Sequence, residues 1–247
     1  MTPQETAAPD YMASTYFEYQ QRYARDIKES DKILLDLIRP ALHAKSNGAQ
    51  LRLLDIGCSN GNLLRHLRAI APAVEYWGGD IQPEVIQRCR SDSSLSGIRF
   101  EVMNARDLSA WPMFDIIIAN AVMFRFPEDD FGVICQSLQR ALVAEGHLFA
   151  LDFYHRFEQD VAIVERSSWH PEGLMLHMRS FKTARRIHLA AGFDEVSFHP
   201  FSIPLDLPER SDDADIGTYT RRTVHGERMQ FRGAIYQPWC HLCARKS

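Results

Sequence analysis

Residues 51–64 constrain the fold of this chain more than any other stretch. They read LRLLDIGCSNGNLL, so that the apolar residues of a short strand lead directly into a turn with two glycines. Leu63, Leu64 and Leu67 then recur at the spacing of one helix face. A strand, a glycine turn and a helix in direct succession predict the first unit of an α/β sheet. A ligand can lie against the bare backbone of such a turn and the free N–H groups of the helix.

Two nucleotide-binding patterns compete for this turn. The dinucleotide fingerprint needs the spacing G-x-G-x-x-G, but Ser59 and Asn62 stand where its second and third glycines belong. This mismatch counts against a nicotinamide oxidoreductase. The remaining pattern is D-x-G-x-x-x-G from Asp55 to Gly61, with Asp80 at the end of the next predicted strand.

The second pattern resembles motif I of the class I S-adenosylmethionine (SAM) methyltransferases. Asp80 resembles the acidic residue of that family that takes the ribose diol. Residues 104–108, NARDL, resemble the segment that frames the adenine, and residues 114–120 resemble the fourth strand, which ends beside the methyl donor. The resemblance covers about residues 50–152 and again the C-terminal strands. It implies SAM as the cofactor and S-adenosylhomocysteine (SAH) as the product.

The resemblance also implies a set of cofactor contacts. Asp55 would orient the loop and the amino end of SAM, and Asp80 would accept both ribose hydroxyls. An N-terminal aromatic residue would close over the SAM carboxylate, or would instead pack against the sheet. The expected cofactor-binding residues are Asp55, Gly57, Cys58, Gly61, Asp80, Ile81, Asn104, Ala105, Asn120 and Tyr23.

Predicted strands and helices alternate along the chain. Strands are expected at 51–56, 74–79, 98–103, 114–119, 146–152, 195–200 and 232–244, and helices at 61–70, 83–91, 129–143 and 180–191. This order predicts an α/β fold with a doubly wound, mostly parallel seven-stranded sheet. Its last strand would be antiparallel, as in the family that the tail resembles. We expect one domain over 1–247, with an N-terminal helical cap at 1–48 and a SAM-binding core at 49–152.

Two segments, 153–179 and 201–230, do not belong to the minimal fold. Both leave from the C-terminal edge of the sheet, where doubly wound folds bind ligands, and connections of this length are usually functional or disordered. We expect them to form a roof over the acceptor together with the N-terminal helix. Three arginines there could bind an anionic acceptor or could be solvated charges: Arg179, Arg221 and Arg222.

Methyl transfer from SAM depends mainly on alignment and exclusion of water, and a hydroxyl acceptor also needs a general base. His155 follows the fifth strand by a few residues and titrates near neutrality. Glu165 and His170 lie in the same insertion. These three residues are the catalytic candidates, although each of them can also be an ordinary hydrogen-bonding residue of the roof.

Composition narrows the class of acceptor. The 247 residues carry a formal net charge of −4, and neither half of the chain is basic, which argues against a large nucleic-acid interface. No apolar run approaches the roughly 18 residues of a membrane span. The polar N-terminus and the five scattered cysteines indicate a cytoplasmic protein, and no metal site is expected.

The predicted function is therefore SAM-dependent methyl transfer to a hydroxyl or amine of a small-molecule metabolite or sugar-like acceptor. An RNA or protein methyltransferase remains an alternative, as does a catalytically silent SAM-binding regulatory protein. The sequence does not indicate which oligomeric state the protein has.

Overall fold

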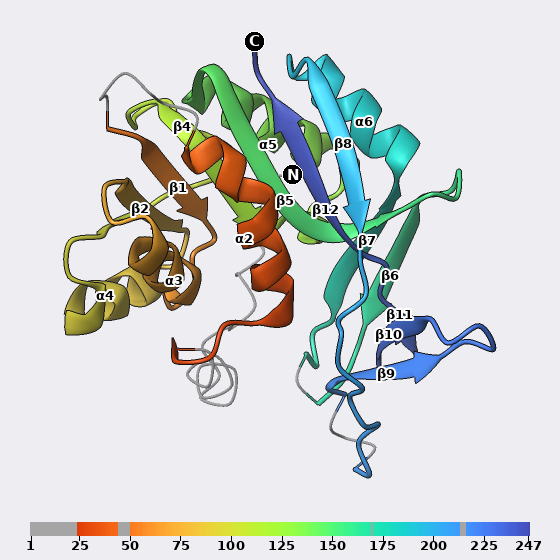
Figure 1. Ribbon diagram of the computed structural model, residues 1–247. Coiled ribbons are helices and arrows are strands. Elements are labelled where there is room, and N and C mark those ends of the chain that lie inside the picture. The colour runs from red at the N-terminus through yellow and green to blue at the C-terminus, as the bar shows by residue number, and fades with distance from the viewer. Residues whose placement is uncertain (1–23, 44–49, 169, 213–215) are drawn as a thin grey trace.

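A central, mostly parallel sheet with helices on both faces organises the computed structural model (Figure 1). The model describes residues 24–43, 50–168, 170–212 and 216–247. Along the main path the strands lie in the order β3-β2-β1-β4-β5-β12-β8. Their bounds are β1 Arg52–Ile56, β2 Glu75–Asp80, β3 Arg99–Val102, β4 Phe114–Asn120, β5 Leu142–His155, β8 Glu195–Pro200 and β12 Trp239–Arg245. β12 runs antiparallel to both of its neighbours, so the predicted fold class is confirmed.

The helices divide between two hydrophobic cores, one on each face of the sheet. On one face pack α2 (Glu29–Leu42), α3 (Asn62–Ile70) and α4 (Pro83–Ser91). On the other pack α5 (Glu128–Ala141) and α6 (Phe181–Ala190), and Figure 1 shows them behind the sheet, with α2 crossing in front. Because both faces are covered, the central strands are nearly continuous apolar runs, as in Leu53–Leu54 and Ile116–Ile118.

The predicted boundaries hold for most elements. Helix 83–91 and strand 195–200 lie where they were predicted, whereas the predicted strand 232–244 was wrong at its start, because β12 begins at Trp239. Gly233 has a left-handed φ of 52°, which interrupts the extended run. Of the predicted N-terminal cap, the structure describes α2; residues 1–23 lie outside the described part of the chain.

The first insertion is a hairpin rather than an irregular loop. β6 (Val161–Glu165) and β7 (Leu174–Ser180) pair antiparallel, and β7 then runs parallel to the end of β5. Tyr154 pairs with Arg179 and His155 with Ser180. The insertion therefore extends the sheet past its C-terminal edge, on the lower side of the molecule in Figure 1.

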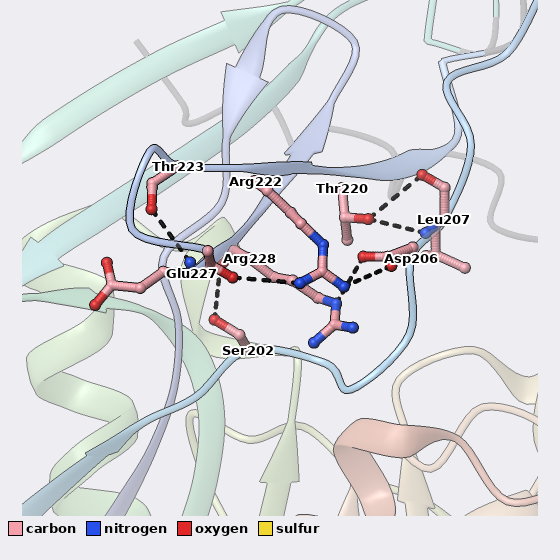
Figure 2. A network of polar contacts seen from close by, with 9 residues as sticks. Ser202, Asp206, Leu207, Thr220, Arg222, Thr223, Glu227 and Arg228 are labelled. Carbon is pink, nitrogen blue, oxygen red and sulfur yellow. Dashed lines mark hydrogen bonds and ion pairs between the residues drawn. The ribbon is translucent and has the colours of Figure 1, made fainter.

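The second insertion forms a small antiparallel sheet of its own. It consists of β9 (Thr218–Arg222), β10 (Arg228–Arg232) and β11 (Ile235–Tyr236). Figure 2 shows how the preceding segment is tied to it, because Asp206 accepts hydrogen bonds from Arg222 and Arg228, each at 2.7 Å. Asp206 and Arg222 are exposed, so the network fixes the arrangement of the segment more than it adds stability.

Two features are absent from the described residues. No helix there combines the length and apolar character that crossing a bilayer requires. The same residues hold no group of three or more His, Cys, Asp or Glu side chains suited to a metal ion.

Candidate functional site

The turn after β1 requires glycine at its first position. Gly57 has a φ of 78°, and a Cβ built there would lie 2.4 Å from Cγ2 of Val122, far inside van der Waals contact. The backbone N–H groups of Gly57 and Cys58 donate to the carbonyl oxygen of Gly79 at 2.7 and 3.0 Å. The turn is therefore fixed to the end of β2 and packed against the segment that follows β4.

Asp80 ends β2 and faces the same turn. Its two carboxylate oxygens accept hydrogen bonds from the backbone N–H groups of Ser59 at 3.3 Å and Gln82 at 3.1 Å. Burial raises the pKa of Asp80, and these backbone hydrogen bonds oppose the shift. Since a carboxylate offers about four lone-pair sites, Asp80 can hold the turn and still accept two hydroxyl groups. This arrangement fits a ribose diol.

Two buried oxygens lie near the ends of β1 and β4. Asp55 is 2% exposed, and its Oδ1 has no hydrogen-bond partner among the described residues, like Oδ1 of Asn120. Burial, and then the nearby Asp31 and Asp80, raise the pKa of Asp55 well above its ordinary range. Buried acceptors without donors cost free energy, so this pair is suited to a ligand that brings N–H groups. The ammonium group of the methionine part of SAM is such a donor.

Helix α2 brings two further charged residues to the same place. Asp31 is 5% exposed, and its Oδ1 accepts a hydrogen bond from Nδ2 of Asn120 at 3.0 Å. Burial lowers the pKa of Lys28, while Asp31 and Asp55 raise it, so this lysine lies beside both acids. The sequence prediction missed both residues. An acidic residue in the first turn of a helix is already explained by the helix dipole, so Asp31 carried no signal of its own.

A buried histidine holds the start of α2 against the sheet. Nε2 of His241 lies 3.2 Å from the carbonyl oxygen of Ser30, and burial lowers the pKa of His241 to about 4. The ring is therefore neutral, and its Nε2–H donates to that carbonyl. Through Ser30 and Asp31, the first turn of α2 is attached to both β12 and β4.

The predicted adenine segment is anchored to α5. Oδ1 of Asn104 accepts from the backbone N–H of Arg106 at 3.0 Å, which leaves its amide nitrogen available to a ligand. Arg106 in turn pairs with Asp130 through two contacts at 3.1 and 2.7 Å. Ala105 packs against the core, and Ile81 is 53% exposed directly after Asp80.

Three predicted cofactor residues differ from the rest. The side chain of Cys58 is buried in the core below the turn, so only its backbone lies where a ligand could meet it. Gly61, with a φ of 70°, is the N-cap of α3. Tyr23 lies outside the described residues.

The three candidate bases fall into two separate groups. His155 ends β5, four residues beyond Leu151, which pairs with Asn120. Its Nδ1 is buried without a partner among the described residues, and burial lowers its pKa while Asp160 raises it. Glu165 and His170 lie together at the hairpin between β6 and β7.

The roof arginines considered for anion binding have other partners. Arg179 is 3% exposed and donates to the carbonyl oxygens of Met123, at 3.3 Å, and Phe126. Arg221 and Arg222 are exposed and pair with Glu209 and Asp206, each at 2.7 Å.

The part of the chain that forms this site is similar to known proteins. Residues 53–146 match the family model described as a methyltransferase domain. The match spans the glycine turn, Asp80, the adenine segment and β4, which are the parts that form the site. Over this segment the chain is similar to the SAM-dependent methyltransferase family, and solved methyltransferase structures share its fold. SAM is the cofactor of that family, and the polar groups at the ends of β1, β2 and β4 fit it.

Individual relatives of the methyltransferase domain are distant. Malonyl-[acyl-carrier protein] O-methyltransferase of Acetivibrio thermocellus is 29% identical over 133 residues, which cover 54% of this chain and 44% of that protein. The match thus spans less than half the length of this curated relative.

Solved structures share the fold over almost the whole chain. Magnesium protoporphyrin IX methyltransferase of Synechocystis PCC 6803, with bound SAM, has a TM-score of 0.58 at 16% identity, covering 97% of this chain and 95% of that one. An amino pentose methyltransferase of Micromonospora echinaspora, also with SAM, has a TM-score of 0.56 at 16% identity, covering 93% and 96%.

Proposed function

We propose that the protein transfers the methyl group of SAM to a hydroxyl or amine of a small-molecule metabolite or sugar-like acceptor in the cytoplasm. The observation that carries the proposal is the meeting of Asp55, Asn120 and Asp80 around the glycine turn. Their buried or half-buried oxygens match the ammonium and ribose hydroxyl groups of one ligand. When bound, SAM supplies an activated methyl group on a positively charged sulfur.

The residues of the chain would then hold SAM, align its methyl group with the acceptor and exclude water from the site. Asp80 holds the ribose end, and Asp55 with Asn120 and Asp31 holds the amino end, so the methyl group would lie beside the residues after β4. The hairpin β6–β7 and the small sheet β9–β11 extend from the same edge of the sheet. We propose that they cover the acceptor, which favours a small molecule over a long polymer.

The named relatives support a small acceptor without identifying it. The two structural neighbours act on a porphyrin and on an amino pentose, and the curated relative is an O-methyltransferase for a malonyl group on a carrier protein. Because the curated relative acts on a group that is linked to a carrier protein, an acceptor tethered to a protein is the second candidate.

Transfer of an isotope-labelled methyl group from SAM tests the proposal. The protein is incubated with methyl-labelled SAM and a metabolite pool freed of protein and RNA, and in parallel with purified RNA and with protein. We expect label to enter the small-molecule fraction and to need an intact Asp80. Label confined to RNA or protein would contradict the choice of acceptor, and tight SAM binding without any transfer would indicate a regulatory protein.

For a hydroxyl acceptor we propose His155 as the base, with Glu165 and His170 as the other candidates. Burial lowers the pKa of His155, which favours the neutral ring, and a neutral ring can take the acceptor proton as the new oxygen–methyl bond forms and the sulfur–methyl bond breaks. Glu165 already pairs with Arg232 at 3.0 Å, and a proton would have to displace that ion pair.

Replacing His155 by alanine should lower turnover roughly 10²- to 10⁴-fold, the usual contribution of a general base, with SAH affinity unchanged. In the wild type, turnover should fall as the pH drops below the lowered pKa of His155, because the protonated ring cannot accept a proton. The control is His225→Ala, since His225 is exposed in the turn between β9 and β10. Full turnover of His155→Ala from about pH 6 to 9 would remove His155 as the base and favour an amine acceptor.

A further inference from the structure

Asp31 contacts the candidate SAM site through the side chain of Asn120. It lies in the first turn of α2 and is 5% exposed. Its Oδ1 accepts hydrogen bonds from Nδ2 of Asn120 at 3.0 Å and from the hydroxyl group of Ser30 at 3.3 Å. Because a buried carboxylate is costly unless donors satisfy it, these contacts hold the acid and the amide in one arrangement.

Asp55 and Asn120 lie on the face of the sheet that α2 covers. β1 and β4 are parallel, with Asp55 paired with Ile118, and side chains two residues apart on a strand share a face. Asn120 therefore shares the face of Asp55 and Ile118. Ile118 packs in the same hydrophobic core as Leu34 of α2, so this is the face from which Asp31 reaches Asn120.

The contact with Asp31 decides which end of the Asn120 amide is left for a ligand. A carboxylate accepts hydrogen bonds and donates none, so the amide nitrogen of Asn120 faces Asp31. The amide oxygen, Oδ1, is buried without a hydrogen-bond partner among the described residues, as is Oδ1 of Asp55. Two buried acceptors on one face of the sheet suit a cationic N–H donor, and a ligand without such a donor leaves both unpaired.

The turn of α2 that carries Asp31 is also held by contacts that do not involve Asn120. The carbonyl oxygen of Ser30 lies 3.2 Å from Nε2 of His241, which is fully buried on β12. Farther along α2, Leu34 and Ile38 are buried in the core under the helix. Asp31 therefore has a fixed position from which its hydrogen bond can orient the amide of Asn120.

We propose that Asp31 is a positioning residue for the amino end of SAM and acts through Asn120. By holding the amide nitrogen, Asp31 keeps the amide oxygen of Asn120 available to the ammonium group of the ligand. The site then selects ligands that carry the amino acid part of SAM over nucleosides that lack it. This inference rests on the proposed function, in which Asp55 and Asn120 hold the amino end.

Titration calorimetry with two ligands tests the inference. SAH carries the amino acid part, whereas 5′-methylthioadenosine keeps the adenosine and the thioether without it. Asp31→Ala should weaken SAH binding about tenfold or more, the effect of losing one hydrogen bond to a charged group, and leave methylthioadenosine binding unchanged. Asp31→Asn should recover most of the SAH affinity, because its amide oxygen can also accept from Nδ2 of Asn120.

Two further variants guard against general effects. Asp36→Ala is the matched control, since Asp36 is exposed on the same helix, where it pairs with Arg39, and it should bind both ligands like the wild type. Asp31→Leu fills the buried space with an apolar side chain, and it should show the same loss of SAH alone if Asp31→Ala does not fold.

A double-mutant cycle with Asn120→Ala tests whether Asp31 acts through the amide. Once the amide is removed, Asp31→Ala should weaken SAH binding no further. An undiminished loss in that background would place Asp31 on the ligand itself and overturn the inference. Unchanged SAH affinity in Asp31→Ala, or equal losses of SAH and methylthioadenosine, would overturn it as well and leave the proposed function standing. Failure of the wild-type protein to bind SAH would instead contradict the proposed function.

Discussion

Alanine at position 80 is expected to weaken SAH binding about 30- to 1000-fold, which corresponds to a loss of about 2–4 kcal/mol. Asp80 would lose two charge-assisted hydrogen bonds to the ribose and also its contacts with the backbone N–H groups of Ser59 and Gln82. Titration calorimetry with SAH measures the loss directly. Circular dichroism of the free protein checks that the sheet remains folded.

Two related variants separate the ribose contact from general effects of charge. Asp80→Asn keeps one acceptor oxygen and should fall between wild type and Asp80→Ala. Asp36→Ala removes an acid from the exposed face of α2, where it pairs with Arg39, and should bind SAH normally. An unchanged SAH affinity in Asp80→Ala would show that the ligand does not use the end of β2.

Methionine at position 179 is expected to lower the free energy of unfolding by about 3–5 kcal/mol. Arg179 is 3% exposed, and its guanidinium carbon lies 4.0 Å from the centroid of the Phe131 ring. It donates to two backbone carbonyls of the segment around the 3-10 helix η3 (Met123–Arg125). The buried carbonyl of Met123, left without a donor, costs about 1–3 kcal/mol, and the cation–ring contact contributes about 2 kcal/mol more, whereas the part-buried carbonyl of Phe126 can meet water. Methionine fills similar space but replaces none of these interactions.

Urea unfolding of Arg179→Met measures this loss. The control is Arg186→Met, because Arg186 forms an exposed ion pair with Glu128 and should change stability by about 0.5 kcal/mol or less. Equal stability of the two variants would mean that the carbonyls around η3 find other donors.

Much of the scaffold was predictable because its signals are local. Buried parallel strands are short apolar runs, and turns at their ends need glycine or short polar residues, as at Gly57 and Asp80. The strand that was placed wrongly shows the limit of this reasoning. Residues 232–244 are continuously rich in aromatic and apolar residues, but the structure divides them among β10, β11 and β12 because the partners of each part lie far away in the sequence.

The roof was predictable in position but not in structure. Its two segments were recognisable as insertions at the ligand edge, whereas the pairing of β7 with the end of β5 depends on contacts made only in the folded chain. Strand register of this kind is set by packing partners rather than by the residues of one strand.

The residues of the candidate site were likewise predictable only in part. Asp55, Asp80 and Asn120 end predicted strands, so their meeting at one edge followed from the fold. Asp31 comes from an N-terminal helix, and its spacing to the other site residues carries no pattern. Only the folded chain brings it to the site.

The central claim is that the ends of β1, β2 and β4 form a SAM site, and a calorimetric titration of the wild-type protein with SAH and, separately, with nicotinamide adenine dinucleotide tests it most directly. The account predicts that SAH binds at one site and raises the melting temperature, with about 2.7 kcal/mol of stabilisation at a hundredfold excess over the dissociation constant. It predicts no binding of the dinucleotide, because Ser59 and Asn62 replace the glycines that a pyrophosphate needs. Tight binding of the dinucleotide with no binding of SAH would contradict the account.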